Sequence, residues 1–374
     1  MEIWNEGKIK DFADVKGGKR LPKGKQLITE QNSHPYIRIR NLGKSKVLEL
    51  NSDYEYVDDE TQEFIAKYIV RAGDILVSVV GTIGLIAIVG KSLDMANQTE
   101  NCDKIINIKG IDRYYLYYYL ISPAGQEEIK RGTVGAVQPK LPLKNIQDIT
   151  VKYPSIGTQQ KIVSILNLLD DKIAANEMIN RNLSEQCDAI YRDQFITKSD
   201  SSWTMGYLSD LITVKYGKDH KKLEDGDIPC YGSGGVMRYV ERPIYDHESV
   251  LIPRKGTLNN VMYVNVPFWS VDTMFYTVMK ISNVAKFVYH YVKGKNLASM
   301  NAGSAVPSMT VDILNAMELQ IPSSTALAEF ETIVQPLYKA MKDNEIENKK
   351  LAELRDTLLP KLMSGELDVS DLDI

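Results

Sequence analysis

Two long segments of the chain carry apolar residues at alternating steps of three and four positions, the spacing of a helix that packs along another helix. The first segment runs from Ile162 to Ile190 and the second from Phe330 to Leu362. Both contain Asn at matching places in the apolar row: Asn176, Asn180, Asn344 and Asn348. A polar side chain there costs stability unless it finds a partner, so we expect the Asn pairs to meet and to set the register.

The alternative is that each Asn pair faces solvent on a helix that bends away at mid-length. Pro336 lies inside the second segment. It removes a backbone donor there and predicts a kink or a delayed start of the regular helix. Gly365 follows the last apolar residues and predicts the end of this helix.

Before each helical segment the chain is expected to form strands and turns. Strict alternation over residues 36–40 predicts a strand with Tyr36, Arg38 and Arg40 on one face. Two apolar runs predict buried strands followed by glycine turns: residues 74–80 before Gly81 and residues 249–252 before Gly256. Two aromatic segments predict short helices with most of their rings in the core: residues 113–120 and 285–291.

These features occur twice in the same order, which indicates an internal repeat. A set of residues near the N-terminus recurs at a constant offset: Trp4, Gly7, Asp11, Val15, Lys16, Gly18 and Lys19 match Trp203, Gly206, Asp210, Val214, Lys215, Gly217 and Lys218. Farther on, Gly81 and Thr82 match Gly256 and Thr257 at a smaller offset, because the second copy is shorter. We interpret the chain as two homologous halves, each ending in a long helix.

The chain has 374 residues, more than one compact core usually holds, and this length agrees with two domains. Hydrophobic residues make up 44% and charged residues 25%, as in ordinary folded proteins. The formal net charge is -4, so binding to nucleic acid would require local clusters of basic residues.

The 3 cysteines lie far apart and form no Cys-x-x-Cys pair, which argues against a disulfide framework and against a thiolate zinc site. The N-terminal residues lack a basic-then-apolar signal, and no run approaches the roughly 18 apolar residues of a membrane span. We therefore expect a cytoplasmic protein without a membrane partner.

Basic residues gather between positions 16 and 46, where Glu30 is the single acidic residue, and this cluster is a candidate for binding phosphate. The alternative is a solvated loop and sheet face. The corresponding region of the second half is basic too, although acidic residues dilute it. Arg38 and Arg40 are the preferred candidates for bases or phosphates, because Arg can bind guanine through two hydrogen bonds.

The complete set of candidate DNA-binding residues is Lys19, Arg20, Arg38, Arg40, Lys44, Thr82, Gln138, Lys140, Lys218, Tyr231, Ser233, Arg238, Arg254, Lys255 and Thr257. Tyr231, Ser233, Arg254 and Lys255 are taken as the second-half counterparts of Arg38 and Arg40. The threonines, Gln138 and Lys140 are expected on turns near the duplex, where ordinary turn roles are the alternative.

The usual catalytic motifs are absent or incomplete. Residues 84–92 resemble a phosphate loop but are one residue too long and strongly apolar, so a strand and a turn are expected. Residues 231–235 begin like a dinucleotide loop, yet Met237 replaces its last glycine. The four histidines lie far apart without metal spacing. An Asn-Pro-Pro-aromatic tetrapeptide, which amino-methyltransferases use, is absent.

Two other classes of function stay open. Asp112, Glu128 and Lys130 could form the carboxylate-and-lysine set of a nuclease, although such residues are more often a solvated helix face. The heptad rows could instead belong to a coiled-coil scaffold that does not recognise DNA.

The chain resembles the specificity subunits of type I restriction-modification systems over nearly its whole length. The segments that carry the resemblance are residues 36–42, residues 231–235, Pro154 with residues 159–163 and 168–173, and the closing residues 354–367. The resemblance implies an α+β fold with two pseudo-repeated mixed α/β target-recognition domains, separated and held by two long coiled-coil spacer helices. The implied division is residues 1–154, 155–198, 199–322 and 323–374: domain, central helix, domain and C-terminal helix.

The resemblance further implies a non-catalytic reader of a split, asymmetric target in double-stranded DNA. Its partners would be two methyltransferase subunits, which methylate adenine at N6, and restriction or translocase subunits. S-adenosylmethionine, ATP and Mg²⁺ would belong to those partners, and no cofactor or metal is expected in this chain. In the second helix, Ala328, Glu329 and Phe330 replace the Gln-Gln-Lys-Ile start of the first helix, and Pro336 interrupts the second helix. These departures leave equal docking of the two methyltransferase copies open.

Overall fold

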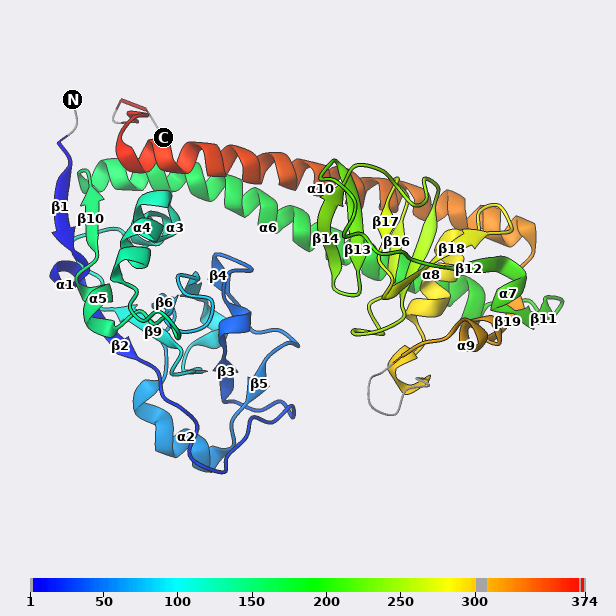
Figure 1. The fold of residues 1–374 in the computed structure, drawn as a ribbon, viewed down its shortest axis with the longest axis horizontal. Coiled ribbons are helices and arrows are strands. Elements are labelled where there is room, and N and C mark those ends of the chain that lie inside the picture. Colours follow the sequence, from blue (N-terminus) through cyan, green and yellow to red (C-terminus); the bar gives the residue numbers. More distant parts are fainter. Residues whose placement is uncertain (1–2, 301–307, 370, 373–374) are drawn as a thin grey trace. The chain divides into compact units, whose positions relative to one another are not determined.

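The computed structural model describes residues 3–300, 308–369 and 371–372. The chain divides into two compact units, Met1–Asn176 with Ile346–Ile374 and Glu177–Glu345. Figure 1 shows strands and short helices in each unit together with parts of two long helices. Within the described ranges, we find no helix with both the length and the apolar character of a membrane span.

The first unit is built around a five-stranded sheet of order β2-β9-β6-β7-β4. Its strands are β2 (Asp14–Gly17), β9 (Cys102–Ile106), β6 (Ile75–Ser78), β7 (Ile86–Val89) and β4 (Val47–Leu48). β4 pairs parallel with β7, and the other neighbours are antiparallel. Alternate residues of β6 and β7 enter two separate apolar clusters, so this sheet has a core on both faces.

Two smaller sheets accompany this one, with the orders β5-β3-β8 and β1-β10. Their strands are β5 (Glu55–Tyr56), β3 (Pro35–Ile37), β8 (Asn97–Gln98), β1 (Asn5–Lys8) and β10 (Thr150–Tyr153). The short helices are α1 (Ile9–Phe12), α2 (Asp59–Ile65), α3 (Arg113–Ile121), α4 (Pro123–Gly132) and α5 (Leu143–Gln147), with 3-10 turns η1 (Ile39–Asn41), η2 (Ala66–Tyr68) and η3 (Lys91–Leu93).

The second unit repeats this plan with a four-stranded sheet of order β12-β18-β15-β16 and a three-stranded sheet of order β14-β13-β17. Its strands are β12 (Ile212–Tyr216), β18 (Met274–Met279), β15 (Ser249–Pro253), β16 (Met262–Val264), β14 (Gly235–Val240), β13 (Ile228–Gly232), β17 (Trp269–Ser270) and the pair β11 (Thr204–Tyr207) and β19 (Glu318–Ile321). The helices are α7 (Leu208–Leu211), α8 (Ala285–Lys293), α9 (Val311–Asn315) and η5 (Leu297–Met300).

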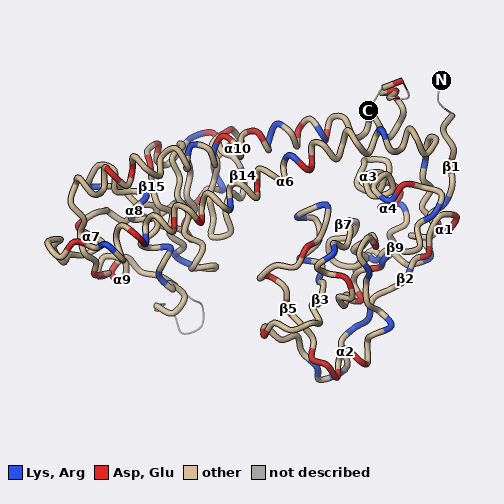
Figure 2. The backbone as a smooth tube through the Cα atoms, turned by 180° about the vertical axis from the view of Figure 1, so that it is seen from behind, with Lys and Arg blue, Asp and Glu red and all other residues tan. Residues whose placement is uncertain are grey.

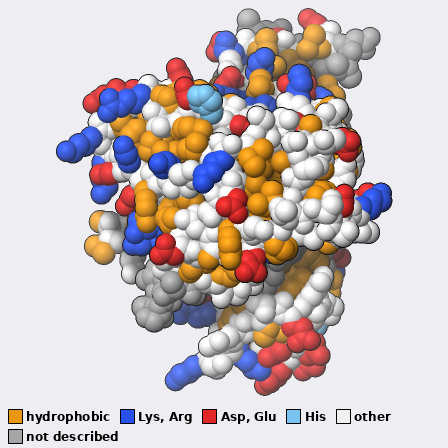
Figure 3. Space-filling model, turned by 90° about the vertical axis from the view of Figure 1, so that its right-hand side faces the viewer, with side chains coloured by type: hydrophobic (Ala, Val, Ile, Leu, Met, Phe, Trp, Pro, Cys, Tyr) orange, Lys and Arg blue, Asp and Glu red, His pale blue; other side chains and the backbone are white. Residues whose placement is uncertain are grey.

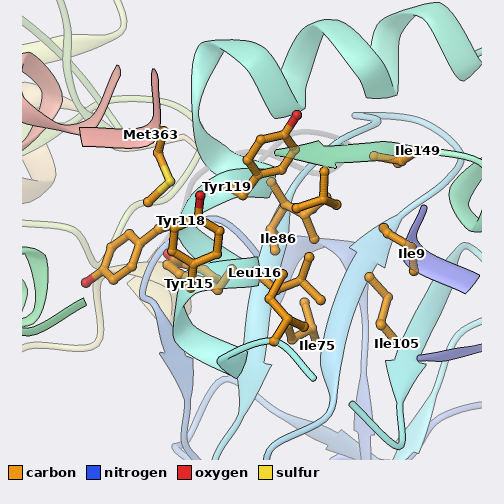
Figure 4. Close-up of a cluster of buried hydrophobic side chains, with 14 of the residues drawn as sticks. Ile9, Ile75, Ile86, Ile105, Tyr115, Leu116, Tyr118, Tyr119, Ile149 and Met363 are labelled. Carbon is orange, nitrogen blue, oxygen red and sulfur yellow. The ribbon is translucent and has the colours of Figure 1, made fainter. Parts of the chain in front are cut away.

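The predicted aromatic helices are confirmed as α3 and α8. Figure 4 shows rings of α3 beside Ile86 of β7, and Ile75 of β6 and Ile105 of β9 belong to the same apolar cluster. Three of these buried rings place their hydroxyls within hydrogen-bond distance of acceptors: Tyr115 at Lys152 O, Tyr119 at Thr150 O and Tyr118 at Asp170 Oδ2. Each ring therefore buries its apolar body without leaving its hydroxyl unpaired.

The two long helices are α6 (Ile156–Arg192), which continues into a π-helical turn (Asp193–Thr197), and α10 (Ser324–Ser364). Each contributes residues to both units. In the first unit Leu166 lies in the same apolar cluster as Leu359, Leu362 and Met363. α6 begins two residues after Pro154. The division of the chain into residues 1–154, 155–198, 199–322 and 323–374 stays a prediction.

The prediction that the Asn residues meet is confirmed. In the first unit the buried Asn176 donates through Nδ2 to Asn348 Oδ1 at 2.8 Å and to Glu347 Oε2 at 2.6 Å. In the second unit Asn344 Nδ2 donates to Asn180 Oδ1 at 2.8 Å, and Asn180 Nδ2 to the Met341 carbonyl. The alternative of solvent-facing Asn pairs is wrong.

Two local predictions need correction. The strand expected over residues 36–40 ends at Ile37, because the Asn41 side chain accepts the Arg38 N–H and holds a 3-10 turn. Tyr36 is buried in β3, and it lines the same hollow as the more exposed Arg38. α10 continues through Pro336 without a break, contrary to the expected delay.

The predicted turns are confirmed. Gly81 and Gly256 have φ of +78° and +84°, a conformation that glycine adopts at little cost. Gly365 has φ of +77° directly after α10, as expected for the residue that ends a helix.

Candidate nucleic-acid interface

Backbone hydrogen bonds define which residues of the two halves are equivalent. Gly18 N donates to Cys102 O in the first half, and Gly217 N donates to Met274 O in the second. One residue later, Lys19 N donates to Gln98 O and Lys218 N to Ser270 O. Lys19 and Lys218 therefore occupy equivalent places, as the repeat predicted.

In the first half, a shallow hollow of about 450 Å³ brings Arg20 and Arg38 together. Its wall also includes Lys25, Tyr36, Glu55 and Glu100. These residues lie far apart in the sequence and meet because β3 stands between β5 and β8. Figure 2 shows basic and acidic segments close together around β3, β5 and α2.

Each arginine of this region is paired with a carboxylate. Arg38 Nη1 lies 2.6 Å and Arg40 Nη2 lies 2.9 Å from the same atom, Glu55 Oε2. Arg20 Nε lies 2.7 Å from Glu100 Oε1. Burial acts to raise the pKa of Glu100, but the hydrogen bonds that its carboxylate accepts, with Arg20 first, bring this pKa below its ordinary value.

The other basic candidates of this half are more loosely held. Lys44 is exposed, with its Nζ 4.0 Å from Asp53 Oδ2. Lys19 places its Nζ 5.6 Å from the centre of the Tyr68 ring. An exposed ion pair contributes little to stability and so does a cation–π contact near the surface, so both ammonium groups can exchange their neighbours for phosphate at low cost.

Two predicted turn residues of the first half meet at one sheet edge. Lys140 forms isolated bridges with Val80 and with Val134, which places it beside the Gly81–Thr82 turn. Gln138 lies on the exposed segment before Lys140. Burial raises the pKa of nearby Asp103 to about 6, and the charge of Lys140 opposes this shift.

The second half builds the equivalent edge with other side chains. Lys255 forms the matching bridge with Ser308, next to Gly256 and Thr257. The Arg254 guanidinium lies 5.4 Å from the centre of the Tyr216 ring, and its Nη1 donates to the Asp272 carbonyl at 3.2 Å. This ring contact holds the guanidinium beside the turn.

Ser233 also reaches this edge. Its carbonyl accepts a 2.8 Å hydrogen bond from Asn260 Nδ2, and a Cβ on Gly256 would lie 2.6 Å from Ser233 Oγ. Tyr231 is half-buried, and burial raises the pKa of its hydroxyl. Arg238 is bound through Nη2 to Asp225 Oδ1 at 2.6 Å and to the Leu223 carbonyl at 3.0 Å.

The expected counterparts of Arg38 and Arg40 need correction. Thr99 N donates to Ile37 O, and Val271 N donates to Tyr231 O, so Tyr231 is the equivalent of Ile37. Gly232 then stands in the place of Arg38. The two halves do not carry their arginines at equivalent positions of this strand.

Sequence reasoning did not identify Glu55, Asp103, Tyr216 or Asn260. Each joins the candidate surface through a strand pairing or a turn contact distant in sequence, such as Tyr36 with Glu55 and Tyr216 with Phe275. Single carboxylates, tyrosines and asparagines at such positions are common on protein surfaces. The sequence around these four residues therefore does not mark them as part of a site.

The carboxylates of the nuclease alternative have structural roles. Asp112 Oδ1 accepts the N–H groups of Tyr114 and Tyr115 at the start of α3. Glu128 Oε2 accepts from Thr150 N at 3.0 Å and forms an ion pair with Arg131. In the described part of the chain, no three His, Cys, Asp or Glu residues are placed to hold a metal ion. Residues 84–92 contain strand β7, as predicted in place of a phosphate loop.

Comparison with known proteins agrees with the repeated plan. The family model of the type I restriction modification DNA specificity domain matches residues 1–185 and 200–356. The specificity subunit of the type I restriction enzyme MjaIX from Methanocaldococcus jannaschii is 24% identical to this chain. The match covers 99% of this chain and 94% of that subunit. The EcoprrI specificity subunit of Escherichia coli is 24% identical over 70% of this chain and 72% of its own.

A solved structure has the same fold. The crystal structure of the S subunit of a type I restriction-modification system from M. genitalium matches with a TM-score of 0.58 at 20% sequence identity. The match covers 96% of this chain and 96% of that one.

Proposed function

Because the chain belongs to the family of type I restriction-modification DNA specificity proteins, we propose that its two halves read the two parts of a split, asymmetric DNA target. The observation that carries this proposal is the pair of equivalent sheet edges. Both place a Gly-Thr turn beside a lysine, Lys140 in the first half and Lys255 in the second. Different side chains around one repeated backbone suit two different sequences of bases.

Recognition by this surface combines two kinds of contact. Lysines near the turns neutralise phosphates and release counterions, which supplies affinity without sequence information. Arg38, Arg40 and Arg254 supply planar donors that fit the paired acceptors of guanine. In the first half, base or phosphate oxygens replace Glu55 and Glu100 as acceptors. These contacts stay a prediction for each residue.

The chain acts without a catalytic site of its own. Methylation of adenine belongs to two methyltransferase subunits, and cleavage or translocation to restriction subunits. S-adenosylmethionine, ATP and Mg²⁺ are bound by those partners in the cytoplasm. The structural roles of Asp112 and Glu128 support a reader over a nuclease.

A genome-wide map of N6-methyladenine tests the proposal. The map is compared between a host with this gene intact and the same host with the gene deleted. Loss of one split, asymmetric motif on deletion is the expected result. Identical maps in a host that expresses a compatible methyltransferase would contradict the proposal.

The scaffold alternative is separated by salt dependence. Affinity of the complex for target duplex should fall steeply as salt rises, because each phosphate contact contributes nearly one unit to the slope of log K against log salt. A scaffold that does not contact DNA predicts no change when Arg38 and Arg40 are replaced by Ala.

A further inference from the structure

We call residues 38–46 the candidate reading segment. Lys46 is its last residue, and the Lys46 side chain contacts helix α6. Lys46 follows Arg38, Arg40 and Lys44 on one continuous stretch, and its side chain is 13% exposed. Its Nζ donates to Asn167 Oδ1 at 2.9 Å and lies 3.6 Å from Asp170 Oδ2.

The ammonium of Lys46 lies among polar side chains of α3 and α6 that also contact one another. Asp171 Oδ1 is 3.5 Å away, and the Tyr118 hydroxyl is 3.4 Å away. The same hydroxyl lies 2.6 Å from Asp170 Oδ2, and burial together with that carboxylate raises the pKa of Tyr118. Lys46 therefore binds a site whose acceptors are already oriented.

The site continues to the second long helix within the same unit. Arg355 of α10 donates through Nη1 to Asp170 Oδ1 at 2.9 Å. The Asp170 side chain is 11% exposed and is shared between Lys46 and Arg355. If α6 and α10 packed differently around Asp170 and Arg355, the position of the Asp170 carboxylate that Lys46 contacts would change.

The backbone on both sides of the reading segment is fixed as well. The Lys46 carbonyl accepts a 2.9 Å hydrogen bond from Ile88 N, at the start of β4. At the other end, the Ile37 carbonyl, directly before Arg38, accepts a 3.1 Å hydrogen bond from Thr99 N. Residues 38–46 are thus held between β3 and α6, with little freedom to shift as a whole.

We propose that Lys46 is a positioning residue that sets the place of residues 38–46 against α6 and so couples reading of the first half-site to the helix pair. This proposal rests on the proposed function. The second half differs: its α8 contacts both long helices, with Lys286 binding Glu331 of α10 at 2.6 Å and Lys293 binding Asp188 of α6 at 2.8 Å. Loss of Lys46 should therefore affect one half-site only.

The test uses Lys46→Met in the complete complex, with methylation mapped across the genome of a host that lacks other type I systems. Methionine is an unbranched side chain one heavy atom shorter than lysine, and it carries no charge and no hydrogen-bond donor. We expect one half of the split motif to become degenerate, with about tenfold less discrimination, while the other half is unchanged. Lys46→Arg should restore discrimination because it restores a donor to the same carboxylate.

Two further variants keep the test decisive if Lys46→Met does not assemble. Asn167→Ala removes the nearest acceptor and leaves the Asp170–Arg355 pair in place, so it should degrade the same half of the motif to a smaller degree. Asp171→Asn changes a partner whose side chain is 74% exposed and screened by water, so it should degrade this half of the motif least of the three variants.

The outcomes separate this inference from the proposed function. If the wild-type chain specifies a split motif and assembled Lys46→Met and Asn167→Ala complexes keep it unchanged, the positioning role is wrong and the reader function stands. Equal degradation of both halves in an assembled complex also overturns the positioning role. If deletion of the wild-type gene removes no motif, the reader function itself fails.

Discussion

The first and second halves share a strand order and differ in charge at equivalent register positions. Pro35 pairs with Tyr56 and Pro229 with Tyr239, and the next pairs are Tyr36 with Glu55 and Cys230 with Arg238. An acidic residue thus stands in the first half where a basic residue stands in the second. Each is the centre of ion pairs: Glu55 binds two arginines, and Arg238 binds Asp225.

The sheet edge beside the turns shows a second exchange. In the first half Val80, two residues after β6, pairs with Lys140, whereas in the second half Lys255, two residues after β15, pairs with Ser308. Both edges carry a lysine, but it comes from opposite sides of the bridge. The comparison teaches that backbone pairing and the core keep the plan, while the side chains around the turns are free to differ.

The polar contacts with the long helices differ most. In the second half Lys286 is almost fully buried between Glu248 and Glu331, under the rings of Tyr263 and Tyr338. The first half uses the partly open site of Lys46. Figure 3, which draws one face of the molecule, shows charged side chains interspersed with apolar ones, unlike this buried cluster.

The largest expected effect comes from breaking the buried cluster. Lys286→Met leaves Glu248 and Glu331 without their cation, and loss of one partner of a buried pair typically costs about 3–5 kcal/mol. Unfolding of the full chain in urea measures the loss of free energy of unfolding. Hydrogen exchange on peptides of each unit then shows which unit is destabilised. The second unit should lose protection and the first should not. Lys46→Met is the matched variant in the first unit. If Lys286→Met and Lys46→Met lost the same free energy of unfolding, the comparison would be contradicted.

A second large effect depends on pH. Burial lowers the pKa of His290 to about 4, against the hydrogen bond and charge of Asp188, which act to raise it. The neutral ring with its proton on Nδ1 satisfies both neighbours, donating to Asp188 Oδ1 and accepting from the Tyr338 hydroxyl. Because the folded pKa lies below the ordinary value of 6.5, this stability is present above pH 6.5 and is lost as the pH falls toward 4.

The shift corresponds to roughly 3 kcal/mol, lost across that pH range. Hydrogen exchange of α8 should therefore accelerate as the pH falls below 6.5, after correction for intrinsic rates. The equivalent helix α3 should not show this loss, because the raised pKa of Asp103 in the first unit contributes stability as the pH falls. His290→Gln should flatten the dependence, and an unchanged profile in that variant would assign the effect to other groups.

The two long helices and their Asn pairs could be predicted from the sequence because their spacing is local and periodic. The turns at Gly81 and Gly256 could be predicted for the same reason. The strand over residues 36–40 could not, since a single hydrogen bond from Arg38 N to the Asn41 side chain ends it. Alternation of five residues does not outweigh such a turn.

The candidate surface was predictable in its basic residues and not in their partners. Glu55 joins Arg38 and Arg40 only through the pairing of β3 with β5, and Asp103 becomes buried only when β9 enters the sheet. Strand pairing between distant segments has no local sequence signal. The charge exchange between Glu55 and Arg238 becomes visible only after the registers of the two halves are aligned.

An intermediate effect is expected from the Asn pairs. Asn176→Leu removes the donor that Asn348 and Glu347 share in a buried place, and we expect a loss of about 1–2 kcal/mol. Asn180→Leu should cost less, because water can reach that half-buried position. Melting temperatures of the full chain test the order. Replacing both Asn176 and Asn348 by Leu should recover the loss, since the unpaired amide is removed and Glu347 keeps its ion pair with Lys172 at 3.2 Å.

The smallest expected effect tests the charge exchange itself. Glu55→Gln removes the negative charge that two arginines share, whereas Asp225→Asn removes a charge that forms an ion pair with Arg238. Both variants should raise the affinity of the complex for DNA and steepen its salt dependence, because freed guanidinium groups attract phosphate. Glu55→Gln should give the larger gain, about 1 kcal/mol, and should weaken discrimination at the first half-site. Equilibrium binding to duplexes altered in one half-site at a time measures both quantities. If the two variants change affinity equally, the exchange of charge between Glu55 and Arg238 does not distinguish how the halves bind DNA.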